Sequence, residues 1–474
     1  MLVNVPRRVL TTKTLNLNKI NNFISLKNSR FIQNASFKYL DDIPVKKGIY
    51  RPQNTNQVVE LVNYARSKGA ILRVMGAGHS VKEAIYAKNS NHNHINAILD
   101  GDLRKVHQIK INENGETASV DVGAGCHLGR DPSDDESTLK NSFNFQVDEK
   151  GYALPILGGM SHQTIAGFLS TSTAGGSLKH TIADVLEEIE VVNGKGEVVT
   201  LNKHTNENVF NASVVSMGLF GIITRARFKL PEKYLVTGTE INQVFKHSLL
   251  VSEDGHYAKL HDALTENEYF HMNWFPQKYV QRTTEWSGAK AGSGLDMKPY
   301  NHTLKVFKMD VKAYLALCFC NIFLNIFGGD KNFTQTIIGK VLNQFVPIGK
   351  PQEFTDLWYN ALPNDDQADV DYLIKTSFTE IWFPLEQIDE VMTKLEKLFS
   401  DHPSYAGNFA LELYGAKRSP YWLSPSYEHD VFRVDPYWWE HNFGDPREYF
   451  EKFWNILLPI NGARLHWGKY LPEP

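Results

Sequence analysis

The chain has 474 residues, of which 42% are hydrophobic and 22% are charged, the balance of an ordinary soluble globular protein. A formal net charge of −3 gives no general reason to expect nucleic-acid binding, and we predict none. Because 474 residues exceed what one hydrophobic core usually holds, the length predicts two domains.

The cysteines and histidines give no sign of a metal site. The three cysteines, Cys126, Cys318 and Cys320, are odd in number, and their spacing fits neither a disulfide framework nor a zinc site. His92 and His94 lie in an Asn-rich stretch without carboxylates at metal-ligand spacing. We therefore predict an intracellular, reducing location and no metal.

Residues 1–42 form a basic leader, and Asp and Glu are absent from residues 1–40. Its basic residues are Arg7, Arg8, Lys13, Lys19, Lys27, Arg30 and Lys38. This composition is typical of a mitochondrial targeting arm, and it is equally that of a disordered basic extension. Both alternatives stay open at this point.

The first readable elements are a helix over residues 53–69 and a strand over Ile71–Met75. Asn54 and Gln57 are spaced like a capping box, and Gly69 marks the C-terminal end of the helix. The strand leads into the turn Gly76–Ser80, whose two glycines can adopt angles that other residues avoid. Such a turn points N–H groups into one concavity, which suits a phosphate. It lacks the Gly-Lys-Ser/Thr of a P-loop and the third glycine and following helix of a Rossmann fingerprint.

The stretch that follows alternates strands with turns rich in small residues. The predicted strands are 97–99, 106–111, 118–122, 185–192, 197–201 and 222–230. Asn193-Gly194-Lys195-Gly196 is a strong hairpin turn between two of them. A polar loop covers 131–142. The segments 158–167 and 170–177 are dense in small and hydroxylated residues, which would let the backbone approach a ligand closely and supply hydrogen bonds.

After Pro231 the strands and helices are less clearly separated by turn residues and aromatic residues become more frequent, so we place a domain boundary near residue 235. The most apolar run is 313–327, interrupted by Asn321 and Asn325. A membrane span needs about 20 residues, so this run predicts a buried helix or, as the alternative, a peripheral membrane contact.

The last stretch contains a helix and a short motif. Asp445-Pro446-Arg447-Glu448 combines an N-cap, a proline at the first helical position and a glutamate at the third, which predicts a helix to about Leu457. It is followed by His466-Trp467-Gly468-Lys469, in which a lysine stands among aromatic, histidine and glycine residues.

Together these motifs resemble the vanillyl-alcohol-oxidase-type (PCMH-type) FAD-binding oxidoreductases, and within them the gulonolactone and arabinonolactone oxidases and the alditol oxidases. The motifs that carry the resemblance are, in chain order, Val74–Ser80, Gly158–Gly167, Thr171–Ala174, Gly221–Thr224, Glu412 followed by Leu423-Ser424-Pro425, and His466–Lys469. The resemblance covers about residues 48–230 well, is patchy over 236–400, and resumes over about 408–472.

The resemblance implies an α+β fold. A PCMH-type FAD-binding domain of two subdomains would span residues 43–235, and an α/β cap domain that binds the substrate would span 236–440. A C-terminal segment, 441–474, would return to the flavin and complete the active site.

The resemblance also implies which residues bind FAD: Val74, Met75, Gly76, Ala77, Gly78, His79, Ser80, Gly158, Gly159, Thr164, Gly167, Thr171, Ser172, Thr173, Ala174, Ile222 and Ile223. His79 stands where many members attach the flavin covalently, by attack of an imidazole nitrogen. Members with a second, cysteinyl link carry that cysteine where this chain has Met160, so we expect a single link.

On the substrate side, the resemblance implies Lys469 and Glu412 as catalytic residues. Lys469 would contact the substrate oxygen or stabilise an alkoxide, and Glu412 would fix neighbouring hydroxyls or accept a proton. Tyr414 and His466 would contact the substrate. Two departures stand out: Tyr414 occupies the place of an arginine in many sugar-oxidising members, and Gly159 that of a serine in the alditol oxidases.

The implied reaction is oxidation of a CH–OH group of a sugar lactone or polyol, by hydride transfer to flavin N5, with molecular oxygen as acceptor. Two alternatives stay open. A dehydrogenase would pass the electrons to a cytochrome or quinone; Ala124 lies where side-chain size can restrict oxygen access, and alanine occurs in both kinds. A flavin-binding protein with weak or no sugar oxidase activity would explain the missing arginine.

Overall fold

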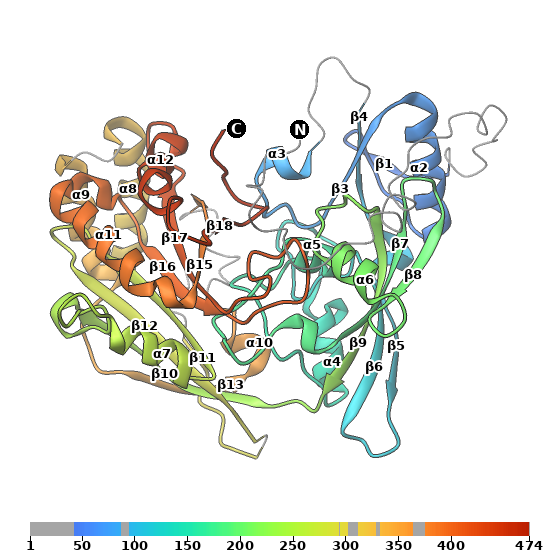
Figure 1. Cartoon of the computed structure of the whole chain (residues 1–474), viewed down its shortest axis with the longest axis horizontal. Coiled ribbons are helices and arrows are strands. Elements are labelled where there is room, and N and C mark those ends of the chain that lie inside the picture. The colour runs from blue at the N-terminus through green and yellow to red at the C-terminus, as the bar shows by residue number, and fades with distance from the viewer. Residues whose placement is uncertain are drawn as a thin grey trace.

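The computed structural model describes residues 42–86, 94–292, 294–301, 311–328, 332–363 and 375–473. Residues 1–41 of the basic leader, and His92, lie outside these residues. Three sheets organise the part of the chain that the structure describes, with helices interspersed between their strands, and the predicted mixture of helix and sheet is confirmed (Figure 1).

The first sheet is small and has the order β1 (Val45–Lys46), β2 (Ile49–Tyr50), β4 (His94–Ile98), β3 (Ile71–Met75). Helix α2 (Thr55–Lys68) packs on it through Leu61 and Ala65, and the short helix α3 (Lys82–Ile85) follows the glycine turn. The caps of α2 are those predicted: Asn54 accepts the N–H of Gln57, and Gly69 is left-handed with φ 60°. The α2 and β3 predictions are confirmed.

The second sheet has the order β5 (Val106–Ile111), β6 (Thr117–Gly123), β9 (Ile222–Pro231), β7 (Leu186–Val192), β8 (Val198–Asn202), and every neighbouring pair is antiparallel. Helices α4 (Phe143–Glu149), α5 (Ile165–Ser170) and α6 (Glu207–Val214) lie in its connections. Val120, Ile189 and Phe228 of the sheet share one core with Phe143 and Phe168 of the helices. The predicted strands and hairpin are confirmed.

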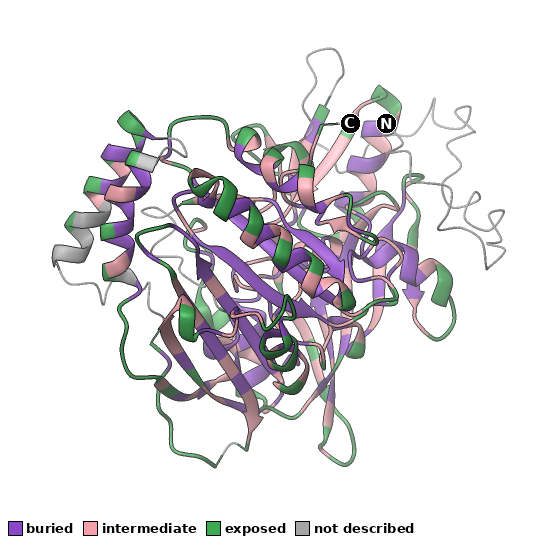
Figure 2. Ribbon diagram, turned by 60° about the vertical axis from the view of Figure 1, so that its left-hand side comes forward, coloured by how far each residue is buried: buried purple, intermediate pink, exposed green. Residues whose placement is uncertain are grey.

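The third sheet fills the C-terminal half. Its main path is β13 (Gln352–Leu357), β10 (Leu235–Val244), β12 (Arg282–Ala291), β11 (Tyr269–Phe275), β16 (Leu411–Ala416), β17 (Val431–Trp439), β15 (Ile381–Pro384) and β18 (Arg464–Leu465), with β14 (Thr376–Phe378) also paired to β17. One face is covered by α7 (Ala258–Glu266), α11 (Ile388–Asp401) and α12 (Pro446–Leu457). Figure 2 shows the buried strands beneath helices whose outer sides are exposed.

The C-terminal elements bring the chain back toward its N-terminal half. Helix α12 begins at Pro446, and the side chain of Asp445 accepts the N–H of Arg447 at 2.9 Å, so this prediction is confirmed. Strand β18 follows α12 and lies at the junction of the two halves (Figure 1). The short helix α10 (Trp358–Ala361) also packs there, because Trp358 Nε1 donates to Asp148 Oδ1 of α4 at 3.0 Å.

The apolar run forms α8 (Val311–Phe327), which pairs with α9 (Asn332–Phe345). The buried-helix prediction is wrong, because Cys320 and Leu324 are buried while a second stripe of α8 is exposed. That stripe comprises Leu315, Phe319, Ile322, Ile326 and Phe327. A search of the described residues finds no helix with both the length and the hydropathy of a membrane span.

Candidate cofactor and substrate site

A cavity of about 320 Å³ lies between the small sheet and the five-stranded sheet. Its walls come from segments that are far apart in the sequence: β3 with the turn after it, α5, and the start of β9. Of the residues predicted to bind a flavin, those that line this cavity are Val74, Met75, Gly76, Ala77, Gly78, His79, Ser80, Thr164, Gly167, Thr171, Ile222 and Ile223. The fold therefore gathers three separate motifs around one space.

The glycines of the turn have two different reasons to be glycine. A Cβ on Gly76 would lie closer than 3.0 Å to Thr164 Oγ1, the side chain that caps α5 by accepting the N–H of Gly167 at 3.2 Å. Gly78 has φ +85°, which other residues rarely adopt. The turn consequently passes directly against α5 and keeps its backbone exposed to the cavity.

Five predicted flavin-binding residues are not among the residues that line this cavity: Gly158, Gly159, Ser172, Thr173 and Ala174. Thr173 lies next to the lining, because its hydroxyl is 3.1 Å from that of Thr171, and Gly158 packs on Thr173 in a second layer. A Cβ on Gly158 would collide with Thr173 Cγ2, so these two segments pack on each other. Ser172, at φ 61°, has its hydroxyl 2.7 Å from that of Ser424, and the carbonyl of Ala174 accepts a hydrogen bond from Arg433. This layer connects the cavity to the C-terminal half.

His79 lies in the cavity wall beside a second histidine. The ring centroids of His79 and His162 are 4.1 Å apart, and the rings are tilted by 58°. The carbonyl of His162 is 2.7 Å from Nδ1 of His127, which lines the same cavity. His162 itself is buried. The buried ring of His162 therefore packs against the ring of His79 in the cavity wall.

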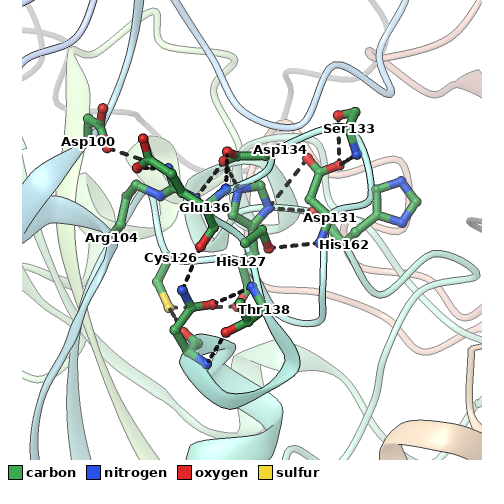
Figure 3. Close-up of polar contacts among 12 residues, drawn as sticks. Asp100, Arg104, Cys126, His127, Asp131, Ser133, Asp134, Glu136, Thr138 and His162 are labelled. Carbon is green, nitrogen blue, oxygen red and sulfur yellow. Dashed lines mark hydrogen bonds and ion pairs between the residues drawn. The ribbon is translucent and has the colours of Figure 1, made fainter.

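The sequence did not indicate the charged wall of the cavity. The charged residues that line it are Arg51, Arg104, His127, Asp131 and Asp134, and Asp100, which is not among the lining residues, pairs with both arginines. Arg104 lies 2.6 Å from Asp134, and the His127 ring lies 3.8 Å from Asp131 and 3.9 Å from Asp134. Figure 3 shows His127 between the two aspartates. The loop that carries them was predicted as a polar loop at 131–142, but nothing in its spacing assigned it a ligand.

The pKa values of two groups at this wall are shifted, those of His127 and of the neighbouring Asp100. Burial lowers the pKa of His127, against the opposing effect of the His162 carbonyl and Asp131, and so favours the neutral imidazole at neutral pH. Burial alone would raise the pKa of Asp100, but the N–H of Gly101 together with Arg51 and Arg104 holds it below its ordinary value. The ionised carboxylate of Asp100 therefore pairs with the two arginines of the wall.

The C-terminal half contributes a sheet face of unusual chemistry. Along β16 and β17 the side chains alternate, so that Leu411, Leu413, Phe432 and Val434 enter the helix-covered core. The opposite set is polar or aromatic although it is buried: Glu412, Tyr414, Arg433, Asp435 and Tyr437. The strand register pairs Glu412 with Asp435 and Tyr414 with Arg433. A buried face with so many charges indicates a site rather than a core.

Arg433 lies at the centre of this face. Its guanidinium is 2.8 Å from both Glu380 and Asp435, and its Nη1 donates to the carbonyl of Ala174 at 3.2 Å. It stacks 3.8 Å from the ring centroid of Tyr414. The position where an arginine was missing from the sequence motif therefore has a guanidinium beside it, supplied by the neighbouring strand.

Glu412 is buried, and its Oε2 accepts the hydroxyl of Tyr437 at 2.8 Å. Burial raises the pKa of Tyr414 well above its ordinary value, so this side chain is a neutral phenol beside the cation of Arg433. The structure thus places Glu412 and Tyr414 on the same face of the sheet, next to a cation that the sequence motif did not include.

The C-terminal motif lies against the glycine turn. The N–H of Val81 donates to the carbonyl of Gly468 at 2.9 Å, and a Cβ on Gly468 would lie 2.7 Å from Ser80 Oγ. His466 is buried, and burial lowers its pKa to about 4, which leaves it neutral at physiological pH. The Nζ of Lys469 lies 3.8 Å from the centroid of Phe378. Lys469 is not among the residues that line the cavity, but Gly468 next to it contacts the glycine turn.

No family model matches the chain. Curated relatives named D-arabinono-1,4-lactone oxidase do match it. The relative from Candida glabrata is 29% identical over 244 residues, which cover 51% of this chain and 41% of the relative. The relative from Candida albicans is 24% identical over 371 residues, 77% of this chain and 60% of the relative. The matched region spans less than two thirds of the length of these relatives. Their names confirm the resemblance to the aldonolactone oxidases.

Solved structures of cholesterol oxidase share the fold. That of the Brevibacterium sterolicum enzyme has a TM-score of 0.69 at 13% identity and covers 92% of this chain and 89% of its own. A solvent-stable cholesterol oxidase has a TM-score of 0.68 at 12% identity, with the same coverage. At this identity the likeness establishes the fold alone.

Proposed function

We propose that this chain is an FAD-dependent oxidoreductase that oxidises a CH–OH group of an aldonolactone or polyol and uses molecular oxygen as acceptor. The observation that carries the proposal is the convergence of three separated motifs on one cavity, with Gly468 of the C-terminal motif hydrogen-bonded to the chain at the end of the glycine turn. The names of the curated relatives support the substrate class.

The cavity residues fit a flavin dinucleotide. The close approach of Gly76 to Thr164 leaves the backbone of the turn open to the cavity, as binding of a pyrophosphate requires. Thr171 adds a hydroxyl to the lining, and Ile222 and Ile223 add an apolar surface for a flat ring. When bound, FAD supplies a hydride acceptor at N5.

The protein must orient the substrate and provide for its hydroxyl proton. In the proposed roles, Lys469 donates a hydrogen bond to the reacting oxygen and stabilises negative charge on it. Glu412 accepts hydrogen bonds from the substrate hydroxyls that neighbour the reacting one. Tyr414, whose ring stacks on Arg433, contacts the substrate. His466, neutral at physiological pH, contacts the substrate without adding charge.

The test is anaerobic mixing of the purified yellow protein with D-arabinono-1,4-lactone, L-gulono-1,4-lactone and a series of alditols. Bleaching of the flavin by any of them supports the proposal, and its absence with all of them would leave only a flavin-binding protein. Peroxide formation on admitting air distinguishes an oxidase from a dehydrogenase, which would instead reduce an artificial quinone or cytochrome.

We expect the flavin to be covalently attached through His79, because this residue of the turn Gly76–Ser80 lines the cavity. In acid-denatured wild-type protein, the yellow colour should stay with the pellet. In His79→Ala it should move to the supernatant. His162→Ala is the matched control, since its ring lies 4.1 Å from that of His79, and it should keep the colour in the pellet. Colour in the supernatant of wild type would overturn the covalent link.

We also propose that the outer face of α8 and α9 docks on an anionic lipid surface. Phe319, Ile322 and Ile326 are 53%, 64% and 63% exposed, and Phe333 of α9 and Phe443, whose N–H bonds to Leu324, are exposed as well. The sequences of the two helices include lysines and no acidic residue, which suits a negatively charged membrane. This docking would give a membrane-associated location.

The docking prediction is checked by flotation with vesicles that contain phosphatidylserine. Wild type should float with the vesicles. The fraction of Phe319→Ser/Ile322→Ser that floats should be lower by a factor of about ten or more. Leu219→Ser is the control, because Leu219 is an exposed apolar residue of the other half. Equal flotation of wild type and the double variant, or a concentration-dependent dimer that the double variant abolishes, would contradict lipid docking.

A further inference from the structure

The segment from β14 to β15 forms hydrogen bonds on both sides of the C-terminal motif His466–Lys469. Strands β15 and β18 pair Ile381 with Leu465, and the carbonyl of Glu380 accepts the N–H of His466 at 3.2 Å. Further along, Phe378 accepts the N–H of Tyr470 at 3.2 Å, and the hydroxyl of Thr379 donates to the Tyr470 carbonyl at 2.8 Å. The backbone of this segment fixes both ends of the motif, but not the side chain of Lys469.

The carboxylate of Glu380 supplies what the backbone does not. Its Oε1 lies 4.0 Å from the Nζ of Lys469, and its Oε2 lies 4.0 Å from the Nε2 of His466. The Nδ1 of His466 accepts the N–H of Gly468 at 3.1 Å, so the neutral ring carries its proton on Nε2, the nitrogen that faces Glu380. One carboxylate therefore faces both polar side chains of the motif.

Glu380 is itself anchored from behind. Arg433 lies 2.8 Å from its Oε2, and Trp382 Nε1 donates to the same oxygen at 3.2 Å. Arg433 in turn donates to the carbonyl of Ala174, so the carboxylate is connected to the layer behind the cavity. The side chain of Glu380 is 6% exposed, and a buried carboxylate remains ionised only when it is paired in this way.

The two carboxyl groups on Arg433 are not equivalent. Burial opposes ionisation of both, but Arg433, His466 and Lys469 hold the pKa of Glu380 below its ordinary value. Burial raises the pKa of Asp435 well above its ordinary value, and the Asp435 Oδ1 has no hydrogen-bond partner among the described residues. Glu380 thus carries the negative charge that faces the C-terminal motif.

We propose that Glu380 is a positioning residue that fixes the side chains of Lys469 and His466 in the C-terminal motif, with Arg433 as its counter-ion. This inference rests on the proposed function for the role of Lys469, but the anchoring itself does not depend on any activity. Glu380 could not be found from the sequence, because Arg433, His466 and Lys469 are more than 50 positions away in the chain and come close to it only through strand pairing.

The test is Glu380→Gln in the flavin-loaded full chain, read first by amide hydrogen exchange. Exchange over residues 464–473 should become faster by about threefold or more, while exchange in α12 stays at the wild-type rate. Anaerobic flavin reduction at saturating substrate should slow by about tenfold or more, with the half-saturating substrate concentration changed by less than about threefold. The matched control is Glu285→Gln, a buried glutamate of the same sheet whose partners are Gln243, Leu249 and Thr283. It should leave both readouts unchanged.

Several outcomes would overturn the proposal. Wild-type exchange over residues 464–473 in Glu380→Gln, or an equal change in Glu285→Gln, would show that Glu380 does not position the motif. If Glu380→Gln does not fold, Lys469→Met removes the same contact from the other side, and unchanged exchange over this segment would then be decisive. If no lactone or polyol reduces the wild-type flavin, the proposed function fails, while the exchange experiment still tests the anchoring by Glu380.

Discussion

Replacing Gly76 with valine is expected to remove most of the bound flavin. The first added atom, Cβ, would already lie closer than 3.0 Å to Thr164 Oγ1, and valine adds two methyl groups beyond it. Thr164 cannot yield freely, because its hydroxyl caps α5 through the N–H of Gly167. Forcing extra groups into a packed position costs about 1–3 kcal/mol, which corresponds to flavin binding weakened by about 5- to 150-fold. The measurement is the flavin-to-protein ratio after purification and reconstitution.

The control for this variant is Gly194→Ala in the β7–β8 hairpin. Gly194 has open space around the position of a Cβ and no left-handed φ, so the substitution should leave flavin content and thermal unfolding unchanged. Thermal unfolding of the flavin-free proteins separates a local defect at the turn from a general loss of stability. A Gly76→Val protein that retains flavin at the wild-type ratio would show that the turn does not contact the cofactor.

The elements that could be predicted from the sequence are those specified by neighbouring residues. Helix α2 has its N-cap and its C-terminal glycine within its own segment, and α12 has Asp445 and Pro446 at its start. The β7–β8 hairpin is determined by the turn at Asn193. Their ends agree with the structure to within about two residues, since each signal is local.

The charged part of the site could not be predicted, because it is formed by strand pairing. Arg433 and Tyr414 are opposite one another only in the β16–β17 register, and Glu380 reaches Arg433 only because β15 also pairs with β17. Apolar and polar side chains do alternate along β17, but the same pattern is typical of a strand whose polar face is exposed to solvent, whereas this strand is buried on both faces. The sequence motif showed that an arginine was absent at 414, and the fold was needed to show that another lies next to it.

The burial of α8 was mispredicted for a related reason. Its sequence is apolar on every side, and a helix that is hydrophobic all round is expected to be buried. Which stripe is covered depends on the tertiary packing, in which α9 together with Phe275 and Trp439 of the large sheet covers one side of α8. The apolar run therefore predicted a helix, but not which of its residues are exposed to solvent.

Substituting methionine for Lys469 is expected to give the largest loss of activity. The side chain of Lys469 is 16% exposed, and methionine matches the length of its apolar part, so we expect the fold and the flavin content to be retained. The variant lacks the cation that stabilises negative charge on the reacting oxygen. Removing one such group costs about 10²- to 10³-fold in the rate of the chemical step. The measurement is anaerobic stopped-flow reduction of the bound flavin at saturating substrate.

The same measurement on Lys397→Met supplies the control, because Lys397 is an exposed lysine that pairs with Asp401 at 2.7 Å on the surface of α11. It should reduce its flavin at the wild-type rate. A Lys469→Met enzyme whose flavin is reduced within about threefold of the wild-type rate would exclude a role for this lysine in the chemical step. A variant with slow reduction but unchanged half-saturation would instead place the lysine's contribution in the transition state, because a group that bound only the substrate would weaken half-saturation as well.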